Sequence, residues 1–250
     1  MGFISGEEEV AVILAPVAVY WLYSGIYEAL GSVRALDSYR LHTRKDEEKK
    51  NMVSKKDVVK GVLLQQAIQV AVSLAMLKLR SEQDGVAVDA KGAQLSTPSS
   101  SSSSSLLSTP SSSSSGHHRV VAPYAFAAQY NHPVDGVLTE TLSGAAAYLA
   151  SGLPPRAAAA FFVFAAVKGI DDHCGLLLPW NPLHAAFENS AAYHDVHHRL
   201  GGGRRNLSQP FFVHWDRLLG THAGYTVREK NSGGDGGGLE AKAVRKDRDA

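Results

Sequence analysis

The sequence predicts an all-α fold, namely an integral membrane helical bundle with a cytosol-facing, helical, histidine-rich metal-binding cap. Three observations predict it: long apolar runs, a charged segment between them, and the histidine-rich stretch AYHDVHH at residues 192–198. The single cysteine, Cys174, excludes a disulfide framework and a zinc–thiolate cluster within one chain. A net charge of +1 creates no basic field, so we expect no nucleic-acid partner.

The N-terminal membrane region, residues 1–80, contains two candidate spans. Residues 10–30 form an apolar run of about 20 residues, which is the length needed to cross a bilayer. Residues 61–79 form a weaker candidate, because they include three glutamines that would face protein rather than lipid. A buried core helix is the alternative for each. Residues 34–60 are rich in lysine and arginine, so the positive-inside rule places them in the cytosol.

Residues 81–116 form a linker of low complexity that contains two long serine runs. Such a composition cannot bury a core, so we expect disorder here, and also in the polar, glycine-rich tail at 231–250. Two spans before the linker would bring the chain out on the luminal side. The histidines from His117 to His198 would then face the lumen unless 61–79 does not span.

The region 117–230 is expected to carry a membrane hairpin over residues 134–167. Its two apolar limbs flank Pro154-Pro155 and are rich in small residues, which allow helices to pack closely. Each limb is short for a lipid-facing span, so a tightly packed or re-entrant hairpin is favoured. A hairpin returns to the side it left, and the histidines before and after it should therefore lie on the same face.

The histidines of this region predict a metal site. His194, His197 and His198 lie at i, i+3 and i+4, which places them on one face of a helix. Neutral imidazoles without thiolates suit iron, zinc or copper. The candidate ligands are seven in all: His117, His118, His132, His173, His194, His197 and His198.

Four polar residues near these histidines are candidates for orienting the imidazole rings through hydrogen bonds: Asn131, Asp171, Asp172 and Asp195. They serve equally well as turn or cap residues, and for Asp195 the two interpretations are about even. The remaining histidines are interpreted as ordinary structural residues: His42, His184, His214 and His222.

Several stretches resemble the plant sphinganine C4-hydroxylase branch of the fatty acid hydroxylase and sterol desaturase superfamily. They include HHRVVAPYAFAAQYNHPVDG at 117–136, the segment 189–200, and SQPFFVHWDRLLGT at 208–221. Matching stretches cover most of the chain outside the serine-rich linker and the tail. All seven candidate ligands match histidines of the family.

The resemblance implies a multi-pass enzyme of the endoplasmic reticulum membrane with a histidine-bound di-iron centre that faces the cytosol. Such enzymes use dioxygen to hydroxylate carbon 4 of a sphinganine chain, as the free base or as ceramide. Cytochrome b5 and its NADH-dependent reductase supply the electrons. An unactivated C–H bond needs a metal–oxygen oxidant, because no protein side chain supplies one.

The chain departs from the family pattern on one side of the expected site. The first histidine of the family's His-x-x-His-His box would fall at Ser114, and an earlier histidine box and its preceding apolar segment are absent. The alternative hypothesis is therefore a catalytically impaired paralogue or a damaged gene product. Such a chain would keep only the scaffold and would pair with an intact hydroxylase. Homo- and hetero-oligomers both stay open.

Overall fold

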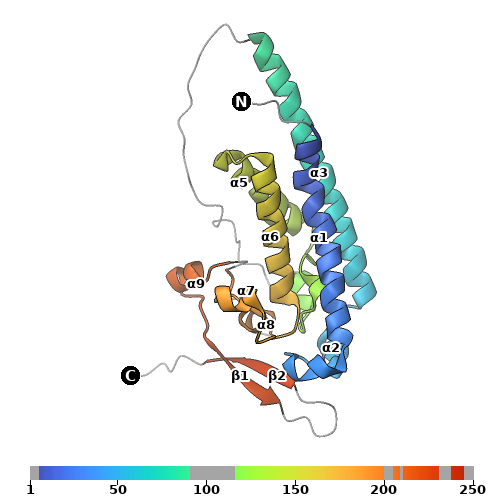
Figure 1. Cartoon of the computed structure of the whole chain (residues 1–250), viewed down its shortest axis with the longest axis vertical. Coiled ribbons are helices and arrows are strands. Elements are labelled where there is room, and N and C mark those ends of the chain that lie inside the picture. Colours follow the sequence, from blue (N-terminus) through green and yellow to red (C-terminus); the bar gives the residue numbers. More distant parts are fainter. Residues whose placement is uncertain (1–5, 91–115, 200–204, 209–210, 231–237, 245–250) are drawn as a thin grey trace.

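The computed structural model describes residues 6–90, 116–199, 205–208, 211–230 and 238–244. Three long helices run along its long axis: α1 (Gly6–Ser32), α3 (Lys55–Ala90) and α6 (Pro155–His173). At one end of these helices, the short helices α2 and α7 to α9 gather with a small sheet (Figure 1). The fold is therefore a helical bundle with a cap at one end, and it is mostly helical as predicted.

Helices α1 and α3 contain the segments that are long and apolar enough to cross a membrane, Val10–Ser32 and Lys55–Lys78. Only 17% and 22% of their most apolar windows is buried, whereas the core helix of a soluble protein is mostly buried. Leu63 and Leu64 lie on the outer face of α3, where they are 51% and 54% exposed. The two helices thus present apolar side chains outward.

The glutamines of α3 face the protein, as the sequence predicts. Gln65 and Gln66 are buried, and the Gln66 amide accepts from the Trp21 indole at 2.7 Å and donates to Gln129 at 2.8 Å. The helix itself continues to Ala90, ten residues into the segment predicted to be a disordered linker. No proline lies between residue 80 and Pro98, so no proline ends the helix at residue 80. Residues 91–115 lie outside the described part of the chain.

A helical hairpin follows, made of α4 (Pro133–Gly136), the π-helical η4 (Val137–Leu142) and α5 (Ser143–Ser151), with α6 returning beside them. Gly152 adopts a left-handed conformation with φ of 63°, and Pro155 begins α6, so the bend has suitable residues at both positions. These helices correspond to the hairpin predicted over 134–167, and α6 extends beyond it to His173. Its depth in a membrane stays a prediction.

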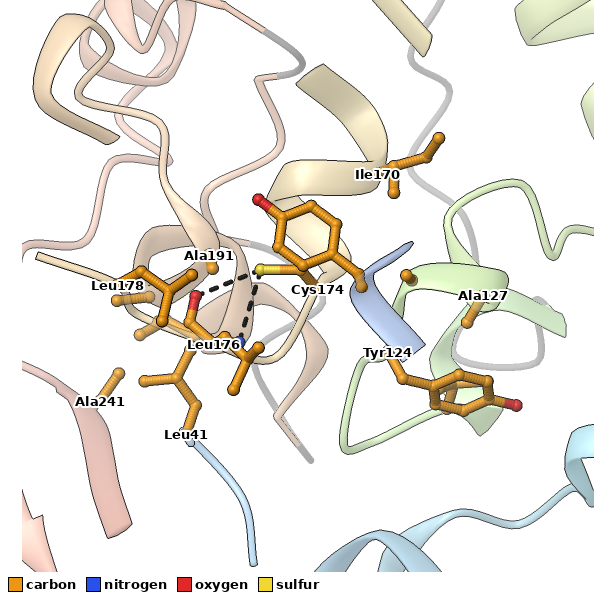
Figure 2. Packing of buried hydrophobic residues seen from close by; sticks show 14 of the residues in the cluster. Leu41, Tyr124, Ala127, Ile170, Cys174, Leu176, Leu178, Ala191 and Ala241 are labelled. Atoms are coloured by element: carbon orange, nitrogen blue, oxygen red, sulfur yellow. Dashed lines mark hydrogen bonds between the residues drawn. The ribbon is translucent and has the colours of Figure 1, made fainter. Parts of the chain in front are cut away.

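The cap has a small hydrophobic core around the end of α6 (Figure 2). The Cys174 Sγ atom lies 3.2 Å from the Leu176 carbonyl oxygen and 3.4 Å from its backbone nitrogen. Gly175 has φ of 69°, and a Cβ atom there would lie 2.8 Å from the Pro123 carbonyl oxygen, so only glycine fits this turn. The chain therefore leaves His173 by a sharp turn into a buried extended segment.

Three segments join edge to edge beneath α8. The Leu41 amide donates to the Gly175 carbonyl at 3.0 Å, and the Leu239 amide donates to the Arg40 carbonyl at 2.7 Å. Strand β1 (Tyr225–Lys230) pairs antiparallel with β2 (Gly238–Ala243), with Tyr225 opposite Ala243. Backbone from the N-terminal, middle and C-terminal parts of the chain is thus hydrogen-bonded together.

The prediction of a tail without structure from residue 231 is wrong for residues 238–243, and the fold is not purely α-helical. Strand β2 satisfies its backbone groups on β1 and on the segment after η1 (Arg34–Tyr39), and Ala241 is completely buried. These partners are distant in sequence, so the polar local composition alone does not reveal the strand.

The charged segment 34–60 packs at the same end as the histidines. Within it, α2 (Arg44–Lys50) ends at Asn51, whose side-chain amide exchanges two hydrogen bonds with the Ala122 backbone, at 2.8 and 3.1 Å. The Met52 amide also donates to the Arg119 carbonyl, at 2.9 Å. The expectation that two spans would carry His117 and His198 to the opposite side is therefore wrong.

Candidate metal centre

Helix α8 (Ala191–His198) is buried at every position although half of its residues are polar. It begins at Ser190, whose hydroxyl accepts from the Tyr193 amide at 3.4 Å. The histidines at positions 194, 197 and 198 share one side of this helix, as the spacing predicts. A buried polar helix is stable only if its side chains have partners, and His197 and His198 find them in backbone carbonyls.

Four histidines from three parts of the chain converge, and we call His117, His173, His194 and His198 the histidine quartet. One potential ligand atom from each lies within 4.8 Å of all the others. The Nε2 atom of His194 lies 2.9 Å from that of His173 and 3.0 Å from that of His198. The His117 ring centroid lies 4.4 Å from that of His198. Helix α6 supplies His173, α8 supplies two members, and η2 (Gly116–Arg119) supplies His117.

The opposite ring nitrogens fix how these imidazoles are protonated. The Nδ1 atom of His173 lies 2.8 Å from the Gly169 carbonyl oxygen, and that of His198 lies 2.8 Å from the Val120 carbonyl oxygen. Carbonyls only accept hydrogen bonds, so each Nδ1 carries the proton and each Nε2 presents a lone pair. The same arrangement holds His197, whose Nδ1 lies 2.9 Å from the Arg205 carbonyl oxygen.

Burial keeps two members of the quartet, His173 and His194, neutral. It lowers the pKa of His173 to about 4, and burial with the neighbouring imidazoles lowers the pKa of His194 well below its usual value. Neutral imidazole is the form that binds a metal ion. The Nε2 lone pairs of His173 and His198 lie 3.4 Å apart, and they repel unless a cation or a hydrogen-bond donor lies between them. The quartet therefore fits a transition-metal ion, and nitrogen donors without thiolate suit iron.

Two other predicted ligands are placed differently. His132 is exposed at the start of α4, and its Nδ1 atom accepts from the Val134 amide at 3.4 Å. Because it precedes Pro133, its backbone is extended and it serves as the helix cap. The structure does not bring His132 to the quartet.

The second is His197, which stacks beside His194 with 5.3 Å between ring centroids. The side chain of the remaining predicted ligand, His118, lies outside the described part of the chain.

The four residues predicted to orient the imidazoles bond elsewhere in the described structure. Asp195 lies 2.5 Å from His42 Nε2, and Asp172 pairs with Lys168. Asp171 accepts from the Tyr27 hydroxyl at 2.5 Å, and the Asn131 amide donates to Glu140 at 2.9 Å. Backbone carbonyls, rather than these side chains, hold the Nδ1 atoms of the three imidazoles considered above. The sequence analysis did not consider backbone carbonyls as orienting groups, because a sequence pattern distinguishes residues only by their side chains.

Two histidines interpreted as ordinary structural residues belong to the supporting network. His42 is buried and ties the segment after η1 to Asp195 on α8. His184, on α7 (Pro182–Ala186), has its Nε2 atom 3.0 Å from Asp171. A signal existed for His42, since YRLH at 39–42 is a further stretch that resembles the hydroxylases. His184 stands alone in sequence and gave none.

Asp216 fixes the far side of α8 to the loop that follows it. It lies on α9 (His214–Leu219) and accepts from the Tyr193 hydroxyl at 2.7 Å and from the Leu207 and Ser208 amides at 2.8 and 2.9 Å. Burial opposes its charge, but these donors and the Thr221 hydroxyl hold the pKa of Asp216 below its usual value. The aspartate in SQPFFVHWDRLLGT therefore supports the helix that carries three histidines.

Comparison with known proteins gives the family. A family model described as fatty acid hydroxylase matches residues 112–221, the part of the chain that holds the quartet. Over its full length the chain is 42% identical to sphinganine C4-monooxygenase 1 of Arabidopsis thaliana, covering 99% of that protein. The chain belongs to the fatty acid hydroxylase family.

Two further relatives are similar to the chain over most of its length. This fatty acid hydroxylase is 42% identical to the very-long-chain aldehyde decarbonylase GL1-9 of Oryza sativa subsp. japonica, over 98% of each chain. It is 32% identical to the sphingolipid C4-hydroxylase SUR2 of Saccharomyces cerevisiae, over 86% of this chain and 72% of the yeast protein. No solved structure matches the chain.

A large apolar cavity lies beside the histidine quartet. It has a volume of about 760 Å³ and lies between α1, α3, η4, α5 and α6. Along α1 its wall extends from Val12 to Tyr20, which is about 12 Å of helix. At one end the wall includes Gly169, whose carbonyl accepts from the Nδ1 atom of His173. A single residue thus belongs to both the cavity wall and the support of a quartet member.

Proposed function

We propose that this chain is a sphinganine C4-monooxygenase, an iron-dependent membrane enzyme that hydroxylates carbon 4 of a sphingoid long-chain base. The observation that carries the proposal is the convergence of four imidazoles one helical turn from a cavity of about 760 Å³, with the Gly169 carbonyl of the cavity wall holding His173. Full-length similarity to sphinganine C4-monooxygenase 1 of Arabidopsis thaliana supports the choice of substrate.

The quartet provides four nitrogen ligands, which are enough to hold one iron ion. A second iron, as in a di-iron centre, would draw on His197 and His118. Bound iron with dioxygen supplies the oxidising power that replaces hydrogen by hydroxyl at an unactivated carbon. The protein's own part is to hold the imidazoles neutral, to fix their orientation through backbone carbonyls, and to keep water from a buried site.

The cavity would hold the hydrocarbon chain of the substrate. Ligand cavities of 300–1,000 Å³ are typical for small molecules, and this one is lined mainly by apolar side chains of five membrane-side elements. A chain that lies along α1 and α6 would bring its polar end toward Gly169 and therefore toward His173. Holding the substrate in this position makes its reaction with the oxidant effectively unimolecular.

The proposed location is the endoplasmic reticulum membrane, with α1, α3 and the hairpin embedded in it. The basic segment 34–60 packs at the histidine end, so the positive-inside rule supports a cytosolic position for the metal centre. Cytochrome b5 and its NADH-dependent reductase would then supply electrons from the cytosolic side.

Complementation tests the proposal. The chain is expressed in cells that lack sphinganine C4-hydroxylase, and C4-hydroxylated long-chain bases are measured by mass spectrometry. We expect product from the wild-type chain and none from His173→Ala at equal protein abundance. Absence of product from a well-expressed, iron-loaded wild-type chain would refute the proposal and favour the impaired-paralogue hypothesis.

A second candidate function follows from the rice relative, which is named as a very-long-chain aldehyde decarbonylase and is also 42% identical. The same cells, supplied with a long-chain aldehyde, are assayed for shortened hydrocarbon. Hydrocarbon without C4-hydroxylated base would establish this second function in place of the first.

A further inference from the structure

The cavity wall includes several polar side chains, and one of them is acidic. Glu140 and Thr141 of η4 line the cavity with Gln129, in a wall that is otherwise mostly apolar. The Thr141 side chain is only 4% exposed, and its hydroxyl has no hydrogen-bond partner among the described residues. A buried hydroxyl directed into a cavity without a partner is a place where a ligand group completes a hydrogen bond.

Glu140 has too few partners for a carboxylate in this setting. The Asn131 side-chain amide donates to its Oε1 atom at 2.9 Å, and no ion pair reaches it from the part of the chain that the structure describes. A carboxylate among membrane-side helices is costly unless a cation or several donors compensate its charge. The cavity beside it offers room for a cationic ligand group.

We propose that Glu140 binds the free ammonium group of a long-chain base, and that the substrate is therefore the free base rather than its N-acylated form. The inference deepens the proposed function and rests on it. An ammonium group donates to a carboxylate in a charge-assisted hydrogen bond, whereas an N-acylated nitrogen is neutral and brings a second chain. The Thr141 hydroxyl bonds one of the neighbouring hydroxyls of the same head group.

The position of Glu140 suits this role. The amine of a sphingoid base is on carbon 2, two bonds from carbon 4, so its binding group must lie at the metal end of the cavity. Glu140, Gln129 and Gly169 line the same cavity, and the Gly169 carbonyl holds His173. Asn131 acts as a positioning residue, because its amide fixes the carboxylate in place.

Binding to the purified full-length protein in detergent tests the inference without turnover. Labelled sphinganine is displaced by unlabelled sphinganine or by N-octanoyl-sphinganine. We expect the wild-type protein to prefer the amine roughly 10- to 100-fold, since a hydrogen bond to a charged group carries that much discrimination. Glu140→Gln should lose this preference, with affinity for the N-acylated compound within about twofold of wild type, since that compound lacks the charge.

Two further variants keep the test decisive. Glu140→Asp retains the charge and should keep part of the preference, which a purely structural role would not require. Glu229→Gln removes an exposed carboxylate from β1 and should match wild type. A preference for the N-acylated compound, an unchanged preference in Glu140→Gln, or an equal loss for both compounds would overturn the inference.

Turnover separates this inference from the proposed function. Glu140→Gln should raise KM for sphinganine about 10-fold or more while kcat changes little, because the lost contact is present before and during the reaction. A wild-type protein that binds the amine selectively but yields no C4-hydroxylated product refutes the function and leaves the amine site standing.

Discussion

The two halves of α6 differ in which side chains they bury: the first, outer half exposes apolar side chains, whereas the last six residues, in the inner half, bury polar ones. In the outer half, Phe161 and Phe164 are 49% and 41% exposed, and neighbouring residues line the apolar cavity. In the last six residues, Lys168 to His173, charged and polar side chains are almost completely buried. One helix thus passes from an apolar exterior to a polar interior.

The difference shows what each half requires. The outer half needs only an apolar environment and space for a chain, so its contacts are non-directional. The inner half needs a partner for each polar group: Asp172 for Lys168, Tyr27 and Asn181 for Asp171, and a backbone carbonyl for His173. We therefore expect changes in the inner half to affect metal and stability, and changes in the outer half to affect substrate choice.

The largest effect is expected at the quartet. His194→Ala removes an Nε2 atom that lies within 3.0 Å of two other ligand nitrogens. Loss of a residue that orients a metal ligand typically lowers metal affinity or activity by about 10–100-fold. Loss of a ligand itself should therefore lower activity by more than about 100-fold and remove most bound iron. Elemental analysis of purified protein measures the iron. The exposed His214→Ala is the control and should retain wild-type iron.

The next effect concerns the support of α8. Asp216→Asn replaces an acceptor of the Tyr193 hydroxyl and two backbone amides by a group that also donates. We expect the free energy of unfolding to fall by about 2–4 kcal/mol, with a lower Tm in detergent. The matched variant Asp135→Asn, on the exposed face of α4, should leave Tm nearly unchanged. Equal Tm values for the two variants would contradict the role assigned to Asp216.

A change in the cavity should separate substrate choice from metal binding. Ala145 lines the cavity, and Ala145→Trp fills part of it. Iron content should stay at the wild-type level, whereas activity on longer-chain bases should fall roughly 10-fold relative to shorter ones, since lost apolar contact and overpacking each cost 1–3 kcal/mol. Ala146→Trp, at an exposed neighbouring position, is the control. Lower iron in Ala145→Trp would show that the two halves are not separable.

The smallest effect is expected at His132. Its ring accepts one long hydrogen bond at the start of α4, so His132→Ala should cost about 0.5–1 kcal/mol of stability and no iron. A loss of iron on this substitution would restore His132 to the ligand set. Iron titration and thermal unfolding of the same preparation measure both quantities.

Local patterns were enough to predict part of this molecule. The apolar runs predicted α1 and much of α3, the double proline predicted the bend before α6, and the spacing of His194 and His198 predicted their common face. These features depend on composition and helical periodicity, which can be recognised within a short window of sequence.

Contacts between distant segments were not predictable in the same way. The ring nitrogens of the quartet are held by carbonyls at Gly169 and Val120, and every residue has a carbonyl, so no residue type marks these positions. The pairing of His42 with Asp195 spans 153 residues. Strand β2 owes its order to β1 and to Arg40 rather than to its own composition.

The junction of Arg40 with Leu239 has a consequence for biosynthesis. The metal end needs backbone from residues 39–42, 117–124, 173–178 and 238–243, so it closes only after almost the whole chain has left the ribosome. At about 5–20 residues per second, the interval between synthesis of residues 40 and 239 is roughly 10–40 s. During that time the Arg40 carbonyl lacks its Leu239 partner, so this edge of the cap forms only near the end of synthesis.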